Sequence, residues 1–103
     1  MTKYNINITQ RAFSDIGECV SFVKNVSKEA AKKLYKEIIN SIKSLETFPN
    51  AYPEIEGLKI KESTVRKMPI HNGTYVILYK VEGSVVVVYN IFDVRKNNLI
   101  TSA

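Results

Sequence analysis

The chain has 103 residues, a length that allows one domain with a modest hydrophobic core and excludes a second domain. Hydrophobic residues make up 45% of it and charged residues 24%, so the composition also excludes a disordered chain. With 15 Lys and Arg against 10 Asp and Glu, the net charge of +5 favours a nucleic acid, the ribosome or an acidic protein as partner. We therefore expect a single domain over residues 1–103.

Cysteine and histidine each occur once, as Cys19 and His71. A disulfide within the chain and a zinc site built from Cys and His ligands are thus excluded, and no metal site is predicted. The first residues lack the apolar stretch of a signal peptide. The longest apolar run, Val85–Tyr89, is far shorter than the roughly 18 residues of a membrane-spanning segment. We expect a cytoplasmic protein that makes no contact with a membrane.

The N-terminal third predicts a strand followed by a helix. Residues 4–9 alternate between polar and apolar side chains, which is typical of a half-buried strand. Thr9 can cap a helix over about residues 10–26, whose polar side would carry Asp15 and Glu18. The predicted buried face of this helix contains Phe13, Ile16, Val20 and Val23.

A second helix is predicted after the cap residue Ser27, and Pro49 and Pro53 stop it. Its apolar stripe contains Ala31, Tyr35, Ile38, Ile42 and Leu45, widened by Leu34 and Ile39. Its polar side carries Lys28, Lys32, Lys33, Lys36 and Lys43. These lysines are most simply a solvated helix face, and the alternative is that they bind RNA or a protein partner.

The C-terminal half predicts three antiparallel strands. Residues 49–63 read as a connecting loop, because Pro, Asn and Gly are scattered among charges. Residues 64–70, 75–82 and 85–94 are rich in β-branched and aromatic side chains and are separated by short turns. The fold class is therefore α+β, in the order β-α-α-β-β-β. The helical hairpin is expected to pack on one face of a small sheet.

The turn at Gly83-Ser84 sets the predicted strand register. If it is a two-residue type II′ turn, Val87 lies opposite Lys80, and Tyr89 lies opposite Leu78. Side-chain alternation then separates an apolar, helix-covered face from a cationic open face. The covered face would carry Tyr75, Ile77, Val81, Val86, Val88, Phe92 and Val94. The open face would carry Lys67, Lys80, Tyr89, Asp93 and Arg95, with Tyr89 able to stack on a base.

Taken in this order, four short motifs resemble the RelE/ParE toxins of bacterial type II toxin–antitoxin systems. The motifs are Leu45-Glu46-Thr47-Phe48-Pro49, Val65-Arg66-Lys67-Met68, Tyr75-Val76-Ile77-Leu78-Tyr79-Lys80-Val81 and Ile91-Phe92-Asp93-Val94-Arg95-Lys96-Asn97. The resemblance covers nearly the whole chain. It implies a small cytoplasmic toxin that slows growth when free, that a cognate antitoxin neutralises, and that uses no cofactor.

Two activities divide the toxins that this chain resembles: RelE-like members cut messenger RNA in the ribosomal A site, whereas ParE-like members inhibit DNA gyrase. Metal-free RNA cleavage needs a base, an acid and cations that stabilise the charge on phosphorus. The resemblance places Arg95 and His71 at positions where RelE-like members carry arginines, and with Arg66 these are the candidate catalytic residues. The candidate target-binding residues are Lys67, Lys80, Tyr89 and Lys96.

The match to either branch is partial, so alternatives stay open. The chain has no tyrosine after Tyr89 and no histidine in its last strand, where ParE-like members often carry one in place of Asp93. Arg95 and Lys96 can also be read as the solvated end of a strand. Arg66 and Lys67 can be read as charges that protect a sheet edge from pairing with another chain. Ribosome-dependent cleavage is slightly favoured over gyrase inhibition, and an inactive relative that only binds a partner is the third alternative.

Overall fold

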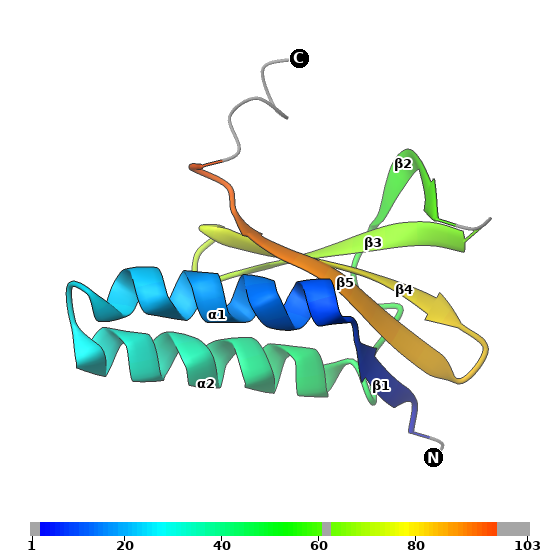
Figure 1. Ribbon diagram of the computed structural model, residues 1–103. Coiled ribbons are helices and arrows are strands. Elements are labelled where there is room, and N and C mark those ends of the chain that lie inside the picture. The colour runs from blue at the N-terminus through cyan, green and yellow to red at the C-terminus, as the bar shows by residue number, and fades with distance from the viewer. Residues whose placement is uncertain (1–2, 61–62, 97–103) are drawn as a thin grey trace.

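The computed structural model in Figure 1 describes residues 3–60 and 63–96, so Asn97 of the closing motif lies outside the described residues. The elements are β1 (Asn5–Ile8), α1 (Gln10–Lys24), α2 (Lys28–Ser44), β2 (Glu54–Ile60), β3 (Ser63–Ile70), β4 (Tyr75–Glu82) and β5 (Val85–Asp93). One sheet has the strand order β1-β5-β4-β3-β2, and the paired helices lie along one of its faces. The predicted α+β class and the helical hairpin on one face are confirmed.

Local capping explains where the helices begin. The Thr9 side chain accepts a hydrogen bond from the backbone N–H of Ala12, and Ser27 accepts one from Ala30, each at 3.1 Å. Both predicted caps are thus confirmed. No helix in the described part of the chain is long and apolar enough to cross a membrane.

The buried stripes of the helices differ in part from the predicted ones. Ile16, Ile38 and Leu45 are buried as expected, but Phe13 and Tyr35 are 60% and 50% exposed. Their expected burial was wrong because the helix neighbours Ala12 and Leu34 face the core instead, and successive residues on a helix point about 100° apart.

The core lies between the hairpin and the covered face of the sheet. Its sheet layer includes the fully buried side chains of Met68, Ile77, Tyr79, Val86 and Val88. The Tyr79 hydroxyl donates to the carbonyl oxygen of Pro49 at 2.7 Å, so the one polar atom of this large side chain is satisfied. Burial raises the pKa of Tyr79 to about 12.

A strand occupies much of the segment predicted as a loop over residues 49–63. β2 pairs antiparallel with β3, with Glu54 opposite Arg66 and Lys59 opposite Thr64. The pairing is irregular between Glu54 and Lys59, and Gly57 there has φ +79°. As an edge strand, β2 tolerates charged and glycine residues that weaken the sequence signal for a strand.

The β4–β5 hairpin follows the predicted register only up to a β-bulge. Lys80 lies opposite Val87 as predicted, and Gly83 has the positive φ of +58° that its turn requires. Beyond this point Leu78 pairs with Asn90, and the predicted pair of Leu78 with Tyr89 is wrong. The extra residue in β5 inverts the alternation of the side chains that follow.

The inverted alternation corrects the predicted faces at the end of β5. Asp93 lies directly opposite the core residue Tyr75 and is only 6% exposed, so it belongs to the covered side. Phe92 moves to the open side, where it is half-buried, and the half-buried Val94 lies in the turn after β5. The open face is therefore more apolar and less cationic near this end than predicted.

Candidate functional site

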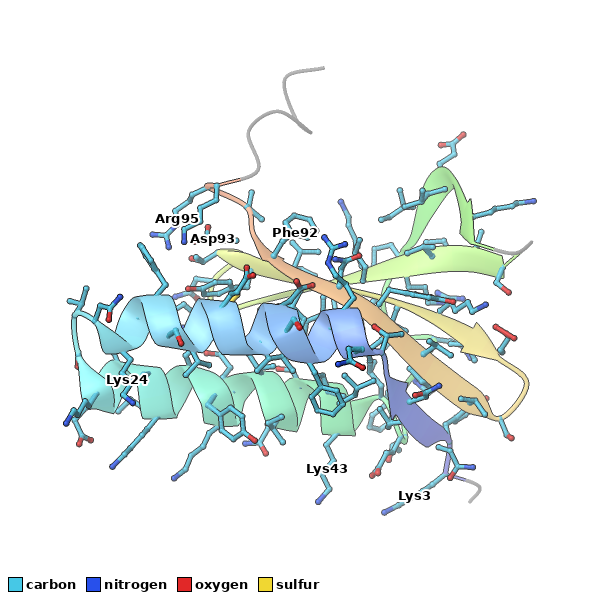
Figure 2. All side chains as sticks on the ribbon, viewed as in Figure 1. Lys3, Lys24, Lys43, Phe92, Asp93 and Arg95 are labelled. Atoms are coloured by element: carbon cyan, nitrogen blue, oxygen red, sulfur yellow. The ribbon has the colours of Figure 1, made fainter. Side chains whose placement is uncertain are left out.

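Several candidate residues meet where the β3–β4 turn approaches the end of β5. Asp93 pairs with Tyr75, and the His71 ring lies 5.8 Å from the Tyr75 ring, centroid to centroid. Arg95 and Lys96 follow β5 with only Val94 between. We call His71, Tyr75, Asp93, Arg95 and Lys96 the turn-end site; Figure 2 labels Asp93 and Arg95 next to each other there.

Arg95 is held by the carboxylate of Asp93. Its Nε and Nη2 atoms donate to the two carboxylate oxygens at 3.1 and 2.9 Å, and its backbone N–H donates at 2.9 Å. Hydrogen bonds from Arg95 hold the pKa of Asp93 below its ordinary value, although burial acts in the opposite direction. The Arg95 side chain is still 66% exposed, so its outward N–H groups can meet an external anion.

His71 is held in the turn by Glu37 of α2, a residue that sequence reasoning did not single out. The carboxylate accepts the His71 backbone N–H at 2.7 Å and lies 2.8 Å from the ring Nδ1. In the neutral ring a proton on Nδ1 leaves Nε2 as the free acceptor, because the carboxylate fixes the tautomer. His71 itself has φ +54°, a backbone conformation that this contact helps to stabilise.

Arg66 and Lys67 do not join the turn-end site. Arg66 lies opposite Tyr79 on the covered side, and its Nη1 donates to the carbonyl oxygen of Tyr52 at 2.6 Å. Tyr79 is four residues along β4 from Tyr75, which corresponds to about 13 Å. Lys67 is exposed and pairs with Leu78, so it faces the open side. Of the three candidate catalytic residues, His71 and Arg95 therefore lie at the turn-end site, and Arg66 lies apart from it.

The remaining cations are engaged with neighbours. Lys80 is only 2% exposed, forms an ion pair with Glu82, and lies 5.6 Å from the centroid of the Tyr89 ring. Hydrogen bonds to Glu82 and Tyr89 raise the pKa of Lys80. Lys96 lies over the Phe22 ring, with its Nζ 3.5 Å from the ring centroid. Because Lys80 and Tyr89 contact each other, neither is presented freely on the open face.

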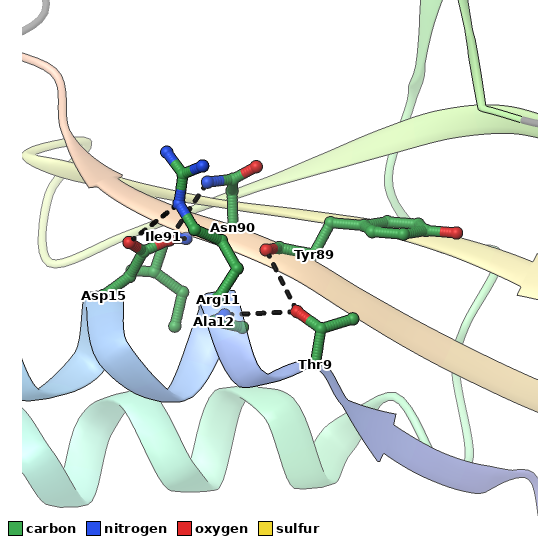
Figure 3. Close-up of polar contacts among 7 residues, drawn as sticks. All are labelled: Thr9, Arg11, Ala12, Asp15, Tyr89, Asn90 and Ile91. Atoms are coloured by element: carbon green, nitrogen blue, oxygen red, sulfur yellow. Dashed lines mark hydrogen bonds and ion pairs between the residues drawn. The ribbon is translucent and has the colours of Figure 1, made fainter.

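Asp15 of α1 binds the edge of β5, as Figure 3 shows. Its Oδ2 accepts hydrogen bonds at 3.0 Å from the Ile91 backbone and from the Asn90 side chain, and its Oδ1 lies 3.4 Å from the Nε of Arg11. The expected outward position of Asp15 was wrong, since its side chain is only 13% exposed. β1 pairs with β5 no further than Val88, so Asp15 covers an edge that β1 leaves open.

A cavity of about 260 Å³ lies between α1 and the end of β5, and Cys19 lines it together with Asp15, Asp93 and Lys96. Burial, followed by the nearby carboxylates of Asp15 and Asp93, raises the pKa of Cys19 to about 11. The thiol therefore stays protonated at neutral pH and is a poor nucleophile. Across residues 3–60 and 63–96, no three His, Cys, Asp or Glu side chains gather as metal ligands would.

Comparison with known proteins assigns the chain to a family. Residues 6–98 match the family described as the ParE toxin of the type II toxin–antitoxin system parDE. The chain belongs to the ParE toxin family. The predicted membership in the wider RelE/ParE group is thereby confirmed. A search of curated proteins for sequence relatives found no match.

Solved structures share the fold of this ParE-family toxin at low sequence identity. A chain of the chromosomal ParDE system from P. aeruginosa is 18% identical with a TM-score of 0.71, over 89% of this chain and 97% of that chain. An arginine-to-alanine double variant of the E. coli toxin RelE in the free state is 16% identical with a TM-score of 0.52, over 98% and 94%. The same variant with a peptide of the antitoxin RelB is 15% identical with a TM-score of 0.51, over 97% and 93%.

The turn-end site of this ParE-family toxin offers the ammonium group of Lys96, which lies over the Phe22 ring, and two groups that are each bound to a carboxylate of the same chain, one exposed guanidinium and one imidazole. Such a pair can bind an anion or an acidic side chain. General acid–base cleavage of RNA would in addition need cations that converge on the same phosphate. Among the described residues, Arg66 and Lys80 lie elsewhere and contact other groups.

Proposed function

We propose that this ParE-family toxin arrests growth by binding DNA gyrase, without breaking a bond itself, and that a cognate antitoxin neutralises it. The observation that carries the proposal is the family match over residues 6–98. ParE-like members of the group that the sequence resembles inhibit gyrase, whereas RelE-like members cut messenger RNA. The match therefore favours the alternative to the ribosome-dependent cleavage that the sequence alone slightly favoured.

The geometry of the turn-end site supports a binding function. RNA cleavage places a base, an acid and cations around one phosphate. Here Arg66 lies on the covered side about 13 Å along β4 from the Tyr75–Asp93 pair. His71 and Arg95 are each anchored by a carboxylate, which holds them in place and lowers the local positive charge. This arrangement suits recognition of a protein surface better than acid–base chemistry on a phosphodiester.

The open face of the sheet supports a protein partner as well. Half-buried apolar side chains of β4 and β5 line this face, namely Val76, Leu78, Val87 and Phe92. The helices lie on the other face. An uncovered apolar surface is typical of a protein interaction site. The similarity to ParDE and to RelE bound to an antitoxin peptide is consistent with an antitoxin partner.

A titration of purified gyrase with purified toxin tests the proposal. We expect supercoiling to stop and gyrase-linked DNA breaks to accumulate near stoichiometric toxin, because a binding inhibitor does not turn over. In parallel, primer extension on messenger RNA from an in vitro translation reaction should give no codon-positioned cuts. Cuts of this kind at substoichiometric toxin, with gyrase unaffected, would contradict the proposal and favour ribosome-dependent cleavage.

A further inference from the structure

Exposed cations gather on the outer side of the helical hairpin, away from the turn-end site. They are Lys24 of α1 and Lys28, Lys32, Lys33, Lys36 and Lys43 of α2. We call these six residues the lysine face. In Figure 2 the labelled Lys43 points away from the sheet, and Lys24 lies beside the start of α2. From Lys28 to Lys43 the face extends over about 22 Å of helix.

The positive charge of the lysine face is left without partners in the described part of the chain. None of the ion pairs found among residues 3–60 and 63–96 involves any of the six lysines. The acidic residues of α2 are Glu29 and Glu37, and Glu37 binds His71. Glu29 is exposed and lies beside the lysines. One carboxylate of this helix thus stands against five ammonium groups.

This arrangement of charge is unfavourable for the isolated helix. Lys28, Lys32 and Lys36 are spaced by four residues, and like charges at this spacing repel each other. Lys28 also lies in the first turn, where the helix dipole disfavours a cation. A bound anion would remove both penalties, so the face is suited to an anionic partner.

The spacing of the lysines favours a partner whose charge repeats along its length. Lys28, Lys32 and Lys36 recur about every 6 Å along the axis of α2. Each strand of duplex DNA carries a phosphate about every 3.4 Å along its axis. The ammonium groups therefore meet phosphates in any register of the two, whereas an acidic protein would need carboxylates at matching positions.

The surface between the helices fits a duplex better than a single strand or a lipid bilayer. A groove of about 450 Å³ lies there, lined by Val20, Ala31 and Tyr35 and rimmed by lysines. A duplex is wider than this groove and would rest on the rim, where the half-exposed Tyr35 can donate its hydroxyl to a phosphate. Single strands stack successive bases on several rings, and α2 offers Tyr35 alone. Insertion into lipid needs an exposed apolar stripe, and that of α2 is buried in the core.

We propose that the lysine face binds the phosphate backbone of duplex DNA without regard to base sequence. The inference goes beyond the binding of gyrase, and its choice of duplex DNA rests on the proposed function, because gyrase acts on duplex DNA. It gives the toxin a second contact with the gyrase–DNA complex, made by residues separate from the turn-end site.

Fluorescence anisotropy of a labelled duplex of mixed sequence tests the inference in the absence of gyrase. Between about 50 and 200 mM salt, the logarithm of the binding constant should fall against the logarithm of salt concentration with a slope of about −5, or about −0.9 for each of the six lysines. The double variant Lys32→Gln and Lys36→Gln should reduce the slope by about 2 and weaken binding roughly 50-fold at 0.1 M salt.

The matched control removes the same charge elsewhere. Arg11→Gln and Lys59→Gln alter two exposed cations outside the lysine face and should leave the slope nearly unchanged. Glu29→Gln should act in the opposite direction and strengthen binding, because it removes the carboxylate beside the lysines. A duplex of different base composition should bind equally well, since contacts to phosphate carry no sequence information. Thermal melts establish that each variant is folded.

Several outcomes would overturn the inference even if the wild-type toxin inhibits gyrase. They are equal weakening by both double variants, no measurable binding to the duplex at about 50 mM salt, and tighter binding to single-stranded RNA of the same length or to vesicles of anionic lipid. Binding to the duplex through the lysine face without inhibition of gyrase would instead overturn the proposed function and leave this inference standing.

Discussion

At the end of β5 a single residue supplies three hydrogen bonds to one carboxylate. Arg95 donates to Asp93 through its backbone and through two guanidinium nitrogens. The acceptor is 6% exposed while the donor side chain is 66% exposed. The pair therefore fixes the direction of an exposed cation from a buried anchor, which is how a short strand end can present a well-ordered binding group.

Arg95→Ala should weaken gyrase inhibition with only a small fall in melting temperature. The backbone N–H of Arg95 still donates to Asp93 in this variant, and the lost side chain was mostly solvated. Arg11→Ala is the matched control, because Arg11 is 73% exposed and also faces a carboxylate, that of Asp15. Supercoiling assays and thermal melts check both variants. Full inhibition by Arg95→Ala together with a large loss of stability would make Arg95 a structural residue.

Asp93→Asn should lower the free energy of unfolding by about 1–2 kcal/mol at pH 7, because it removes charged acceptors from a buried position. The pKa of Asp93 lies below the ordinary value of 3.8 in the folded state. The stabilisation is therefore complete above pH 4 to 5 and is lost as the pH falls through the lowered pKa. Urea unfolding at pH 7, 5, 3 and 2 measures this, with the exposed Glu56→Gln as control. A difference that persists undiminished at pH 2 would contradict the assignment.

Residue-scale features divide into those that sequence predicts and those that it does not. The caps at Thr9 and Ser27 depend on neighbours three residues away, and their sequence pattern identified them. The contact of Glu37 with His71 spans 34 residues, and no local pattern signals it. The candidate cations stay a prediction, and their partners in the fold, such as Asp93 for Arg95 and Glu82 for Lys80, decide which of them are exposed.

At the scale of elements, the join between α1 and β5 depends on the bulge in β5. Asn90 and Ile91 follow the bulge, and both donate to Asp15 at 3.0 Å. Thr9 adds to the join, since it donates to the Tyr89 carbonyl oxygen at 3.3 Å while capping α1. A buried carboxylate with several such donors is costly to remove because the freed backbone N–H is left unpaired.

Asp15→Ala should therefore destabilise the protein by about 1–3 kcal/mol. Glu18→Ala on the exposed side of the same helix is the matched control and should change stability by less than about 0.5 kcal/mol. Denaturant unfolding of both variants gives the comparison. If the two variants lose the same small amount of stability, then Asp15 does not hold the strand edge.

The elements also mark the limit of prediction from this sequence. Strong periodicity predicted both helices and the three long strands with nearly correct ends. β2 was missed because its pairing is irregular and Gly57 interrupts it. The bulge in β5 was missed because an extra residue in a continuous run of β-branched and aromatic side chains leaves no composition signal. The predicted faces at Phe92 and Asp93 were consequently inverted.

At the scale of the whole molecule, the fold separates three surfaces. The helical hairpin covers one face of the sheet and has a groove between α1 and α2, the open face is apolar at its centre, and the turn-end site lies at the end of β5. Of the candidate cations within β3 and β4, only Lys67 is exposed on the open face, since Lys80 is buried against Glu82 and Tyr89.

Expression of the toxin in bacteria without its antitoxin tests the central claim most directly. Growth should stop, gyrase-linked breaks should accumulate in the chromosome, and primer extension should find no codon-positioned cuts in messenger RNA. Co-expression of the antitoxin should restore growth. Unimpaired growth with soluble, folded protein would contradict the toxin function, and growth arrest with cut messenger RNA and an intact chromosome would contradict gyrase as the target.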